Sequence, residues 1–96
     1  MLTQARVEFL NGISYYEKLR YKMGTRFKVE VEQTLLWLVH HPEACHLRPG
    51  GYRRLNLRVF PNYIPYIVRG SVLWVLAVAH KRRKPEYWIQ RKKKVT

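Results

Sequence analysis

The hydrophobic residues of the first forty positions recur at the spacing of amphipathic helices. Phe9, Ile13 and Tyr16 fall on one face of a helix that runs to about Arg20, and Thr3 is placed to cap its start. The polar positions between them would face solvent. The pattern therefore predicts a first helix whose apolar stripe packs on the rest of the molecule.

A second helix is predicted directly after it. Residues 22–24 indicate a break, Thr25 can cap the next helix, and His41-Pro42 ends it because the residue before proline avoids helical geometry. With so short a joint, residues 5–41 should form an antiparallel helix hairpin. The inner face of the second helix comprises Phe27, Val31, Leu35 and Leu38.

The periodicity then changes from helical to alternating. Residues 52–60 alternate apolar and polar side chains, which is typical of a strand with one wet face. Residues 63–68 and 72–79 predict two more strands, and Pro65 suggests an irregular or edge position for the second. We expect residues 52–80 to form an antiparallel meander. On the first strand, Leu55, Leu57 and Val59 point to one side, and Arg54, Asn56 and Arg58 to the other.

The last segment predicts one more short helix. Pro85 suits a first helical turn, so we expect a helix over residues 85–91 and a frayed basic tail over residues 92–96. Residues 1–96 thus predict one domain of the α+β class. Its helix hairpin packs on a three- to four-stranded antiparallel sheet, and a short helix follows.

Charge narrows the choice of partners. Nineteen Lys and Arg residues oppose six Glu and no Asp, which gives a net charge of +13 and indicates an anionic partner. The lone Cys45 excludes an internal disulfide and suits a reducing cytoplasm. No apolar run reaches the roughly 20 residues of a membrane span, and residues 1–10 do not resemble a signal peptide. We expect neither a membrane partner nor a small-molecule substrate.

Metal and cofactor chemistry is not indicated. The acids are scattered glutamates, and no glycine-rich phosphate loop is present. The cluster of His40, His41, Cys45 and His46 lacks the usual zinc-ligand spacing, and histidines at a helix C-terminus are favoured by the helix dipole. We therefore predict no metal site and no cofactor.

A catalytic set can still be drawn from cations, His and Tyr. His80, Arg82, Arg83 and Tyr87 lie within eight positions, and such side chains can cleave RNA by proton transfer and phosphorane stabilisation. The meander would bring two further arginines near them. The alternative is a solvated basic rim that holds an acidic partner and catalyses nothing. The expected contacts to a target or nucleic acid are Arg54, Arg58, Lys81 and Lys84.

A second surface is predicted on the other helix. Val29, Leu36 and Trp37 fall off the inner stripe, which makes this helix apolar on more than one face. An apolar outer face in so short a chain favours partner docking or self-association.

The chain resembles the RelE/ParE superfamily, the toxins of type II toxin–antitoxin modules often labelled plasmid stabilisation proteins. The resemblance covers about Ala5 to Arg91. It rests on the order of elements and on six segments: Ile13–Glu17 (ISYYE), Gly24–Phe27 (GTRF), His41–Ala44 (HPEA), Arg53–Leu55 (RRL), Arg58–Pro61 (RVFP) and Val75–Trp88 (VLAVAHKRRKPEYW).

The resemblance implies a growth-inhibiting toxin and a cognate antitoxin that neutralises it. ParE-like members inhibit DNA gyrase by binding, and the His80-x-Arg82 step before a short helix looks ParE-like. RelE-like members are ribosome-dependent mRNA interferases, and Arg83 and Tyr87 overlap positions that they use. We favour the ParE-like interpretation and keep the RelE-like one as the alternative.

The chain departs from the family pattern at its start. Family members usually carry a strand before the first helix, whereas only residues 1–4 precede the helical pattern here. A missing strand would leave a sheet edge unpaired, which invites association. A third interpretation is thus an inactive family member that acts only as a binding partner.

Overall fold

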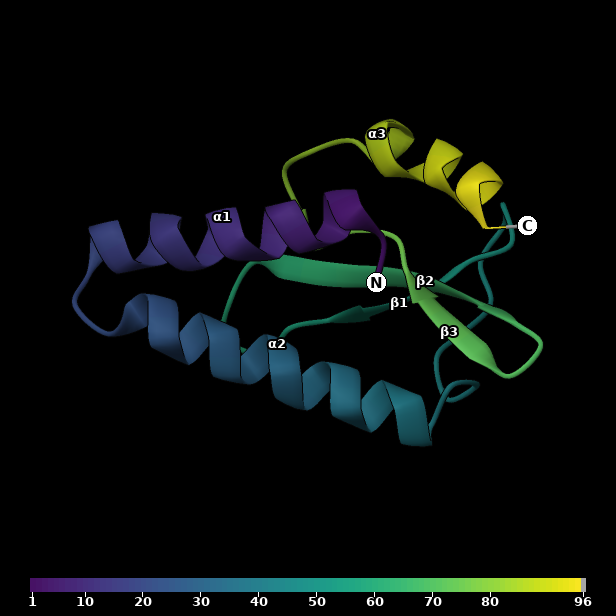
Figure 1. Cartoon of the computed structure of the whole chain (residues 1–96), viewed down its shortest axis with the longest axis horizontal. Helices are drawn as coiled ribbons and strands as arrows, with labels where there is room; N and C mark the ends of the chain where they lie inside the picture. Colours follow the sequence, from purple (N-terminus) through teal and green to yellow (C-terminus); the bar gives the residue numbers. More distant parts are fainter. Residues whose placement is uncertain (96) are drawn as a thin grey trace.

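The computed structural model describes residues 1–95, apart from the side chain of Glu86. Its architecture is α+β, as predicted, with a helix hairpin and a short C-terminal helix on an antiparallel sheet (Figure 1). Figure 1 shows α2 and α3 on opposite sides of the sheet. The elements are α1 (Thr3–Leu19), α2 (Met23–His40), β1 (Arg53–Asn56), β2 (Asn62–Arg69), β3 (Val72–Val75), β4 (Ala79–His80), α3 (Glu86–Ile89) and the 3-10 helix η1 (Gln90–Lys94).

The hairpin forms as predicted, but its caps differ. Thr3 begins α1 rather than capping it, and Thr25 lies inside α2. The start of α2 is capped instead by the Glu17 carboxylate of α1, which accepts the backbone N–H groups of Lys22 and Gly24 at 3.0 and 3.1 Å. Gly24 also lets the helices meet, because a Cβ there would lie 2.4 Å from a backbone oxygen of α1.

The core between hairpin and sheet is aromatic. Phe27 is fully buried, and its ring centroid lies 4.9 Å from that of Tyr16 and 5.2 Å from that of Phe60. The Tyr16 hydroxyl donates to the Asn62 side chain at 2.7 Å, which satisfies the one buried polar residue of this core. The predicted inner stripe of α2 is confirmed, with Val31 and Leu38 fully buried and Leu35 partly buried.

The sheet has the order β1-β2-β3, and β4 extends the β3 side of β2. The central strand β2 is buried along Asn62–Ile67, so both of its faces are covered. Asn62 contacts α1 on one face, which we call the hairpin face. Tyr63, the next residue, contacts Trp88 of α3 on the other, which we call the C-terminal face.

The predicted third strand is interrupted. Tyr66 pairs with Val75, and Tyr63 pairs with Ala79, so two residues of β2 oppose three residues at 76–78. One extra residue in an antiparallel partner is a β-bulge. The bulge confirms the irregular position predicted for Pro65, whereas the edge alternative is wrong. Pro65 lies in the central strand, where its missing N–H faces the interrupted partner.

The first predicted strand is shorter than expected. β1 ends at Asn56, and the chain turns through residues 57–61 to β2. Leu57 is buried as predicted, but Val59 is 67% exposed because it lies in this turn. Within β1 the predicted alternation holds: Arg54 and Asn56 share the face of Pro65 and Tyr63, and Leu55 shares the face of Ile64.

The C-terminal residues are ordered where a frayed tail was predicted. The 3-10 helix η1 continues α3 to Lys94, and Val95 is buried. Its burial anchors residues 92–95 against the core, whereas Thr96 lies outside the described residues. Among the described helices, none combines the length and apolar character needed to cross a membrane.

Candidate functional site

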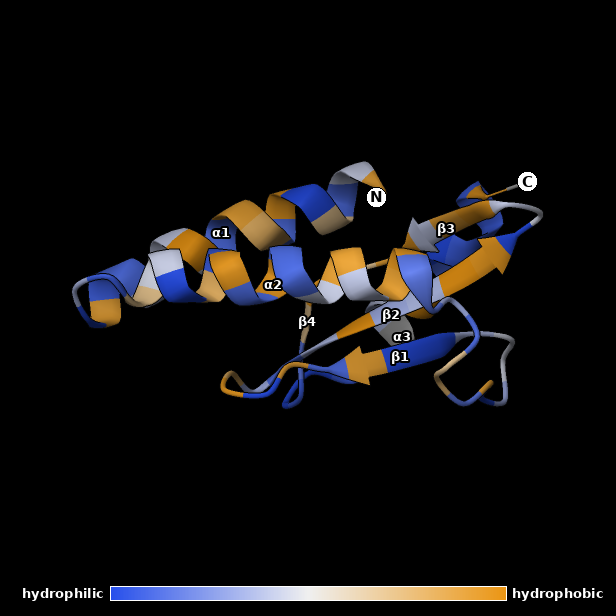
Figure 2. Cartoon of the chain, turned by 90° about the horizontal axis from the view of Figure 1, so that it is seen from below, coloured by the Kyte–Doolittle hydropathy of each residue, from blue (hydrophilic) through white to orange (hydrophobic). Residues whose placement is uncertain are grey.

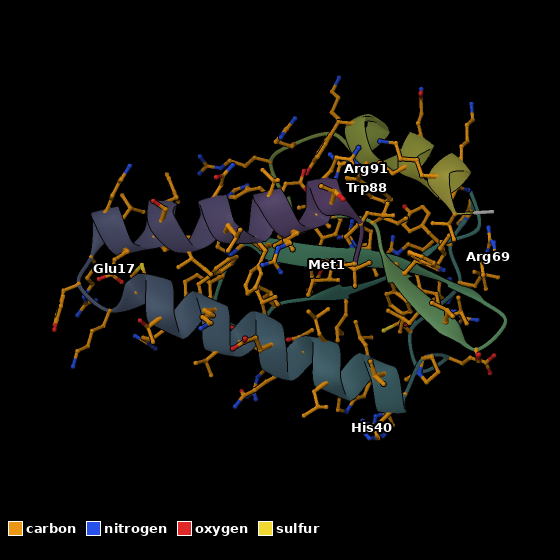
Figure 3. All side chains as sticks on the ribbon, viewed as in Figure 1. Met1, Glu17, His40, Arg69, Trp88 and Arg91 are labelled. Atoms are coloured by element: carbon orange, nitrogen blue, oxygen red, sulfur yellow. The ribbon has the colours of Figure 1, made fainter. Side chains whose placement is uncertain are left out.

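The C-terminal face is built around Trp88. This side chain is fully buried, and its indole N–H donates to the Tyr63 hydroxyl at 2.9 Å. Its ring meets the Tyr52 ring edge-on, with 4.8 Å between centroids. Figure 3 shows Trp88 and Arg91 where the C-terminal segment meets α1 and the sheet. The tryptophan therefore anchors α3 on β2 and fixes the position of its neighbours.

Arginines lie over the exposed sides of this aromatic layer. The Arg83 guanidinium is 3.7 Å from the centroid of Tyr87, and that of Arg91 is 5.3 Å from the same ring. The Arg54 guanidinium is 4.2 Å from the centroid of Tyr63. Each distance is within the range of a cation–π contact. The Nε atom of Arg54 is buried without a hydrogen-bond partner among the described residues, so this donor is still free.

An ion pair ties the C-terminal segment to the bulge. Arg91 donates from its two terminal nitrogens to the Glu8 carboxylate at 3.0 and 3.1 Å. It also donates to the Leu76 carbonyl at 3.0 Å, while Glu8 accepts the Val78 N–H at 3.2 Å. The pair thus satisfies backbone groups that the bulge frees, and it joins α1, the sheet and η1.

The phenol of Tyr87 is held in its neutral form. Burial raises its pKa above the usual value, and the nearby Glu8 carboxylate raises it further, against the opposing effect of Arg83 and Arg91. A phenol with a raised pKa is a weak proton acceptor at neutral pH. The ring is therefore better suited to stacking and hydrogen-bond donation than to general base catalysis.

The predicted catalytic set is only partly assembled. Arg83 and Tyr87 stack, and Arg54 lies on the same face of the sheet through Tyr63. His80 pairs with Asn62, whose side chain contacts the hairpin, so His80 belongs to the other face. Arg58 also lies apart, in the turn after β1, where it lines two hollows along α2. The expectation that all these groups gather around His80 is wrong, because Arg54, Arg83 and Tyr87 lie on the C-terminal face and Arg58 lines the hollows along α2.

The remaining cations of the loop before α3 face solvent. Lys81, Arg82 and Lys84 are exposed. The Arg82 backbone N–H donates to Nδ1 of His80 at 3.1 Å, which orients the imidazole along the loop. The loop thus presents a run of cations beside the Arg83–Tyr87 stack, as suits contact with an anionic partner.

The second predicted surface lies along α2. Val29, Leu36 and Trp37 are 44%, 63% and 43% exposed. Figure 2 shows hydrophobic and hydrophilic bands alternating on the side of α2 turned to the viewer. The Trp37 ring is held in place by the stacked His41 ring, with 4.5 Å between centroids. The three predicted docking residues are thus exposed on a rigid helix.

Two hollows run between α2 and the turn after β1. Their volumes are about 540 and 390 Å³, and they share Glu30, Gln33 and Arg58 in their walls. Together they form one groove, which we call the α2 groove. Val29 lines one end and Trp37 the other. The Glu30 carboxylate accepts hydrogen bonds from the backbone N–H groups of Arg58 and Val59, and Arg26 and Arg58 bring two cations to the walls of the groove.

The histidine cluster caps a helix. Nδ1 of His40 lies 2.9 Å from the Leu36 carbonyl oxygen, and Nδ1 of His41 lies 2.9 Å from that of Trp37. Among the side chains that the structure describes, no three His, Cys, Asp or Glu residues are grouped so that they could hold a metal ion. These contacts use the histidines at the end of α2.

Sequence reasoning missed the residues that organise the C-terminal face. Tyr63 and Trp88 were not identified as its core, and Arg91 was assigned next to a frayed tail. The available signal was Glu8, one of only six acids in the chain, placed on the first helix.

Comparison with known proteins gives no match to a family model, a curated protein or a solved structure.

Proposed function

We propose that this chain is the toxin of a type II toxin–antitoxin module, that it acts in the cytoplasm by binding a target such as DNA gyrase, and that a cognate antitoxin neutralises it. The observation that carries the proposal is the pairing of two unlike surfaces. A run of exposed cations flanks the Arg83–Tyr87 stack, and a partly apolar groove with free cations lies along α2.

Binding is favoured over catalysis by the state of the titratable groups. His80 and Tyr87 lie on different faces of the sheet, so they cannot serve one reacting centre as acid and base. Burial and the Glu8 carboxylate raise the pKa of Tyr87, which disfavours the phenolate that a general base would need. Cations fixed on a rigid aromatic layer can instead hold an anionic or acidic surface.

The α2 groove supports an acidic, amphipathic antitoxin segment. Val29 and Trp37 would take its apolar side chains, and Arg26 and Arg58 would take its carboxylates. The chain's net charge of +13 would speed the encounter with such a partner. Neutralisation by an acidic protein is therefore consistent with the composition.

Expression of the chain alone tests the proposal. We expect growth arrest, loss of gyrase supercoiling by the purified protein, and unaffected translation at early times. A Lys81→Glu/Lys84→Glu variant should lose the effect, since both residues are exposed in the cationic loop. A control variant Lys18→Glu/Lys28→Glu changes the charge equally on the exposed hairpin and should retain it. Unchanged supercoiling at saturating protein would reject the gyrase target.

A second candidate, an mRNA interferase of the RelE type, is favoured by one observation. Arg54, with a free Nε donor, and Arg83 flank the Tyr63 and Tyr87 rings on the C-terminal face. Such a cluster could bind a phosphodiester and stabilise added charge. Primer extension on translated mRNA should then show cuts that disappear with Arg83→Ala. The control Arg69→Ala removes an exposed arginine at the end of β2 and should leave the cuts intact.

A further inference from the structure

The outer edge of β3 is open to another strand. A two-residue turn connects β2 to β3, and Gly70 in this turn has φ +60°. The two strands pair antiparallel, with Arg69 opposite Val72. In such a ladder, hydrogen-bonding groups alternate between the two sides of the strand. Those of Val72 and Trp74 face β2, and those of Leu73 and Val75 face outward.

One outward group already has a strand-like partner. The Leu2 N–H donates to the Val75 carbonyl at 3.1 Å, which confirms the outward direction of Val75. Among the described residues, no hydrogen bond engages the backbone N–H or C=O of Leu73. The strand carries neither Lys nor Pro, the residues that commonly protect an exposed edge.

An apolar hollow opens beside this edge. Its volume is about 350 Å³, and it lies between the start of α1, the second half of α2 and β3. Among the described residues of its wall, the charged side chains are those of Arg6 and Glu32. The apolar wall comprises Met1, Phe9, Leu35, Val39, Leu73 and Val75.

We propose that β3 pairs antiparallel with β3 of a second copy of this chain, centred on Leu73, to form a dimer with one continuous sheet. The arrangement is self-complementary, because Leu73 of each copy offers one free N–H and one free C=O to the other. The two hollows then adjoin across the Leu73 pair and close each other.

The charges of the hollow also suit a second copy. A wall with one cation and one anion can meet its own two-fold image, with Arg6 of each copy towards Glu32 of the other. A strongly acidic partner would find no excess of positive charge there. The second copy is thus favoured at this edge, whereas the α2 groove is the surface that suits an acidic partner.

Sedimentation equilibrium of the purified chain over a concentration series tests the dimer. Salt gives a distinctive signature, because copies with a net charge of +13 repel each other. We expect the association constant to rise several-fold between about 50 and about 500 mM NaCl, since the Debye length shortens. Binding to an anionic partner would weaken under the same change. A chain that stays monomeric throughout overturns the proposal.

Matched variants locate the interface. Val72→Lys places a cation on the exposed edge and should lower the association constant at least about tenfold. Val59→Lys adds the same charge at an exposed turn position and should leave it unchanged within about twofold. Equal dimerisation of wild type and Val72→Lys, or loss of the dimer with Val59→Lys, overturns the proposed edge.

Hydrogen exchange of the wild-type chain provides an independent readout. The Leu73 amide should exchange more slowly as the dimer fills, because it becomes a donor to the second copy. The Val72 amide already faces β2 and should change little. A dimer in which the Leu73 amide gains no protection overturns the antiparallel β3 pairing.

Discussion

The two faces of the sheet are stabilised in different ways. On the hairpin face, Phe27 and its aromatic neighbours form an apolar core with one internal hydrogen bond, between Tyr16 and Asn62. On the C-terminal face, an aromatic layer is bordered by arginines and tied down by the Glu8–Arg91 pair. The interior of the hairpin face is therefore structural, and the binding surfaces on that side, such as the α2 groove, lie at its margins. The C-terminal face instead places its cations directly on the aromatic layer.

A substitution in the core of the hairpin face should cause the largest loss of stability. Phe27→Ala removes a fully buried ring that contacts Tyr16 and Phe60, and should cost about 4 kcal/mol in the free energy of unfolding. Urea denaturation followed by circular dichroism measures this loss. The control Leu36→Ala truncates an exposed residue of the same helix and should change stability by less than about 0.5 kcal/mol. A small effect of Phe27→Ala would contradict the described core.

The C-terminal face should respond more locally to loss of its ion pair. Glu8→Gln leaves the partly buried Arg91 without a counter-charge and should cost about 2 kcal/mol. Hydrogen exchange should show opening concentrated at Val78 and in η1. Adding Arg91→Gln should cost less than the sum of the single changes, because the two residues interact directly. Additive losses of stability would show that the two residues are not coupled. The control is Glu43→Gln, which makes the same change at an exposed glutamate.

A smaller effect tests the anchor of α3. Tyr63→Phe removes the hydroxyl that accepts the buried Trp88 N–H and should cost about 1 kcal/mol. Trp88 fluorescence should shift because its indole loses this contact. Tyr15→Phe removes an exposed hydroxyl from α1 and should change neither stability nor Trp88 emission. An unaltered Trp88 signal in Tyr63→Phe would contradict the hydrogen bond.

The smallest effect on stability is expected at alkaline pH. It allows one tyrosine from each face to be compared. Burial raises the pKa of both Tyr16 and Tyr87, with second contributions from Tyr15 and Glu8 respectively. An unfolded tyrosine loses its proton near pH 10, whereas these folded phenols retain theirs. Their contribution to stability is therefore complete below about pH 10 and is lost as pH rises through the folded pKa values.

Denaturant midpoints between neutral and alkaline pH measure this loss. Arg83→Ala should raise the pKa of Tyr87 further, because it removes a cation that lowers it, and should leave the pKa of Tyr16 unchanged. Phenolate absorbance against pH reports both shifts. A lower pKa of Tyr87 in this variant would contradict the Arg83–Tyr87 contact.

The hairpin face could be predicted from the sequence, and the C-terminal face could not. The spacing of Phe27, Val31 and Leu38 is local, so periodicity alone identifies the buried side of α2. The Glu8–Arg91 contact joins positions 83 residues apart, and no local pattern encodes it. The bulge could not be predicted from the sequence for the same reason. Residues 72–79 are continuously apolar, and only their pairing with β2 reveals the extra residue.

The candidate site was affected by the same limit. Placing Arg58 beside His80 required a strand that continued to Phe60, but β1 ends four residues earlier. Arg83 lies in the loop just before α3, and Tyr87 lies four positions later within that helix. Their contact therefore follows from local spacing. Within the predicted set, local spacing brings Arg83 and Tyr87 together, whereas the positions of His80 and Arg58 depend on strand pairing and on where β1 ends.

The contact between Glu8 and Arg91 has a consequence for protein synthesis. A ribosome adds Arg91 83 residues after Glu8, so the cationic face cannot be completed until Arg91 has been synthesised. Tyr87 and Trp88 also leave late, after the hairpin and most of the sheet are available to fold. A premature stop codon anywhere before position 91 would thus yield a product without its finished basic surface.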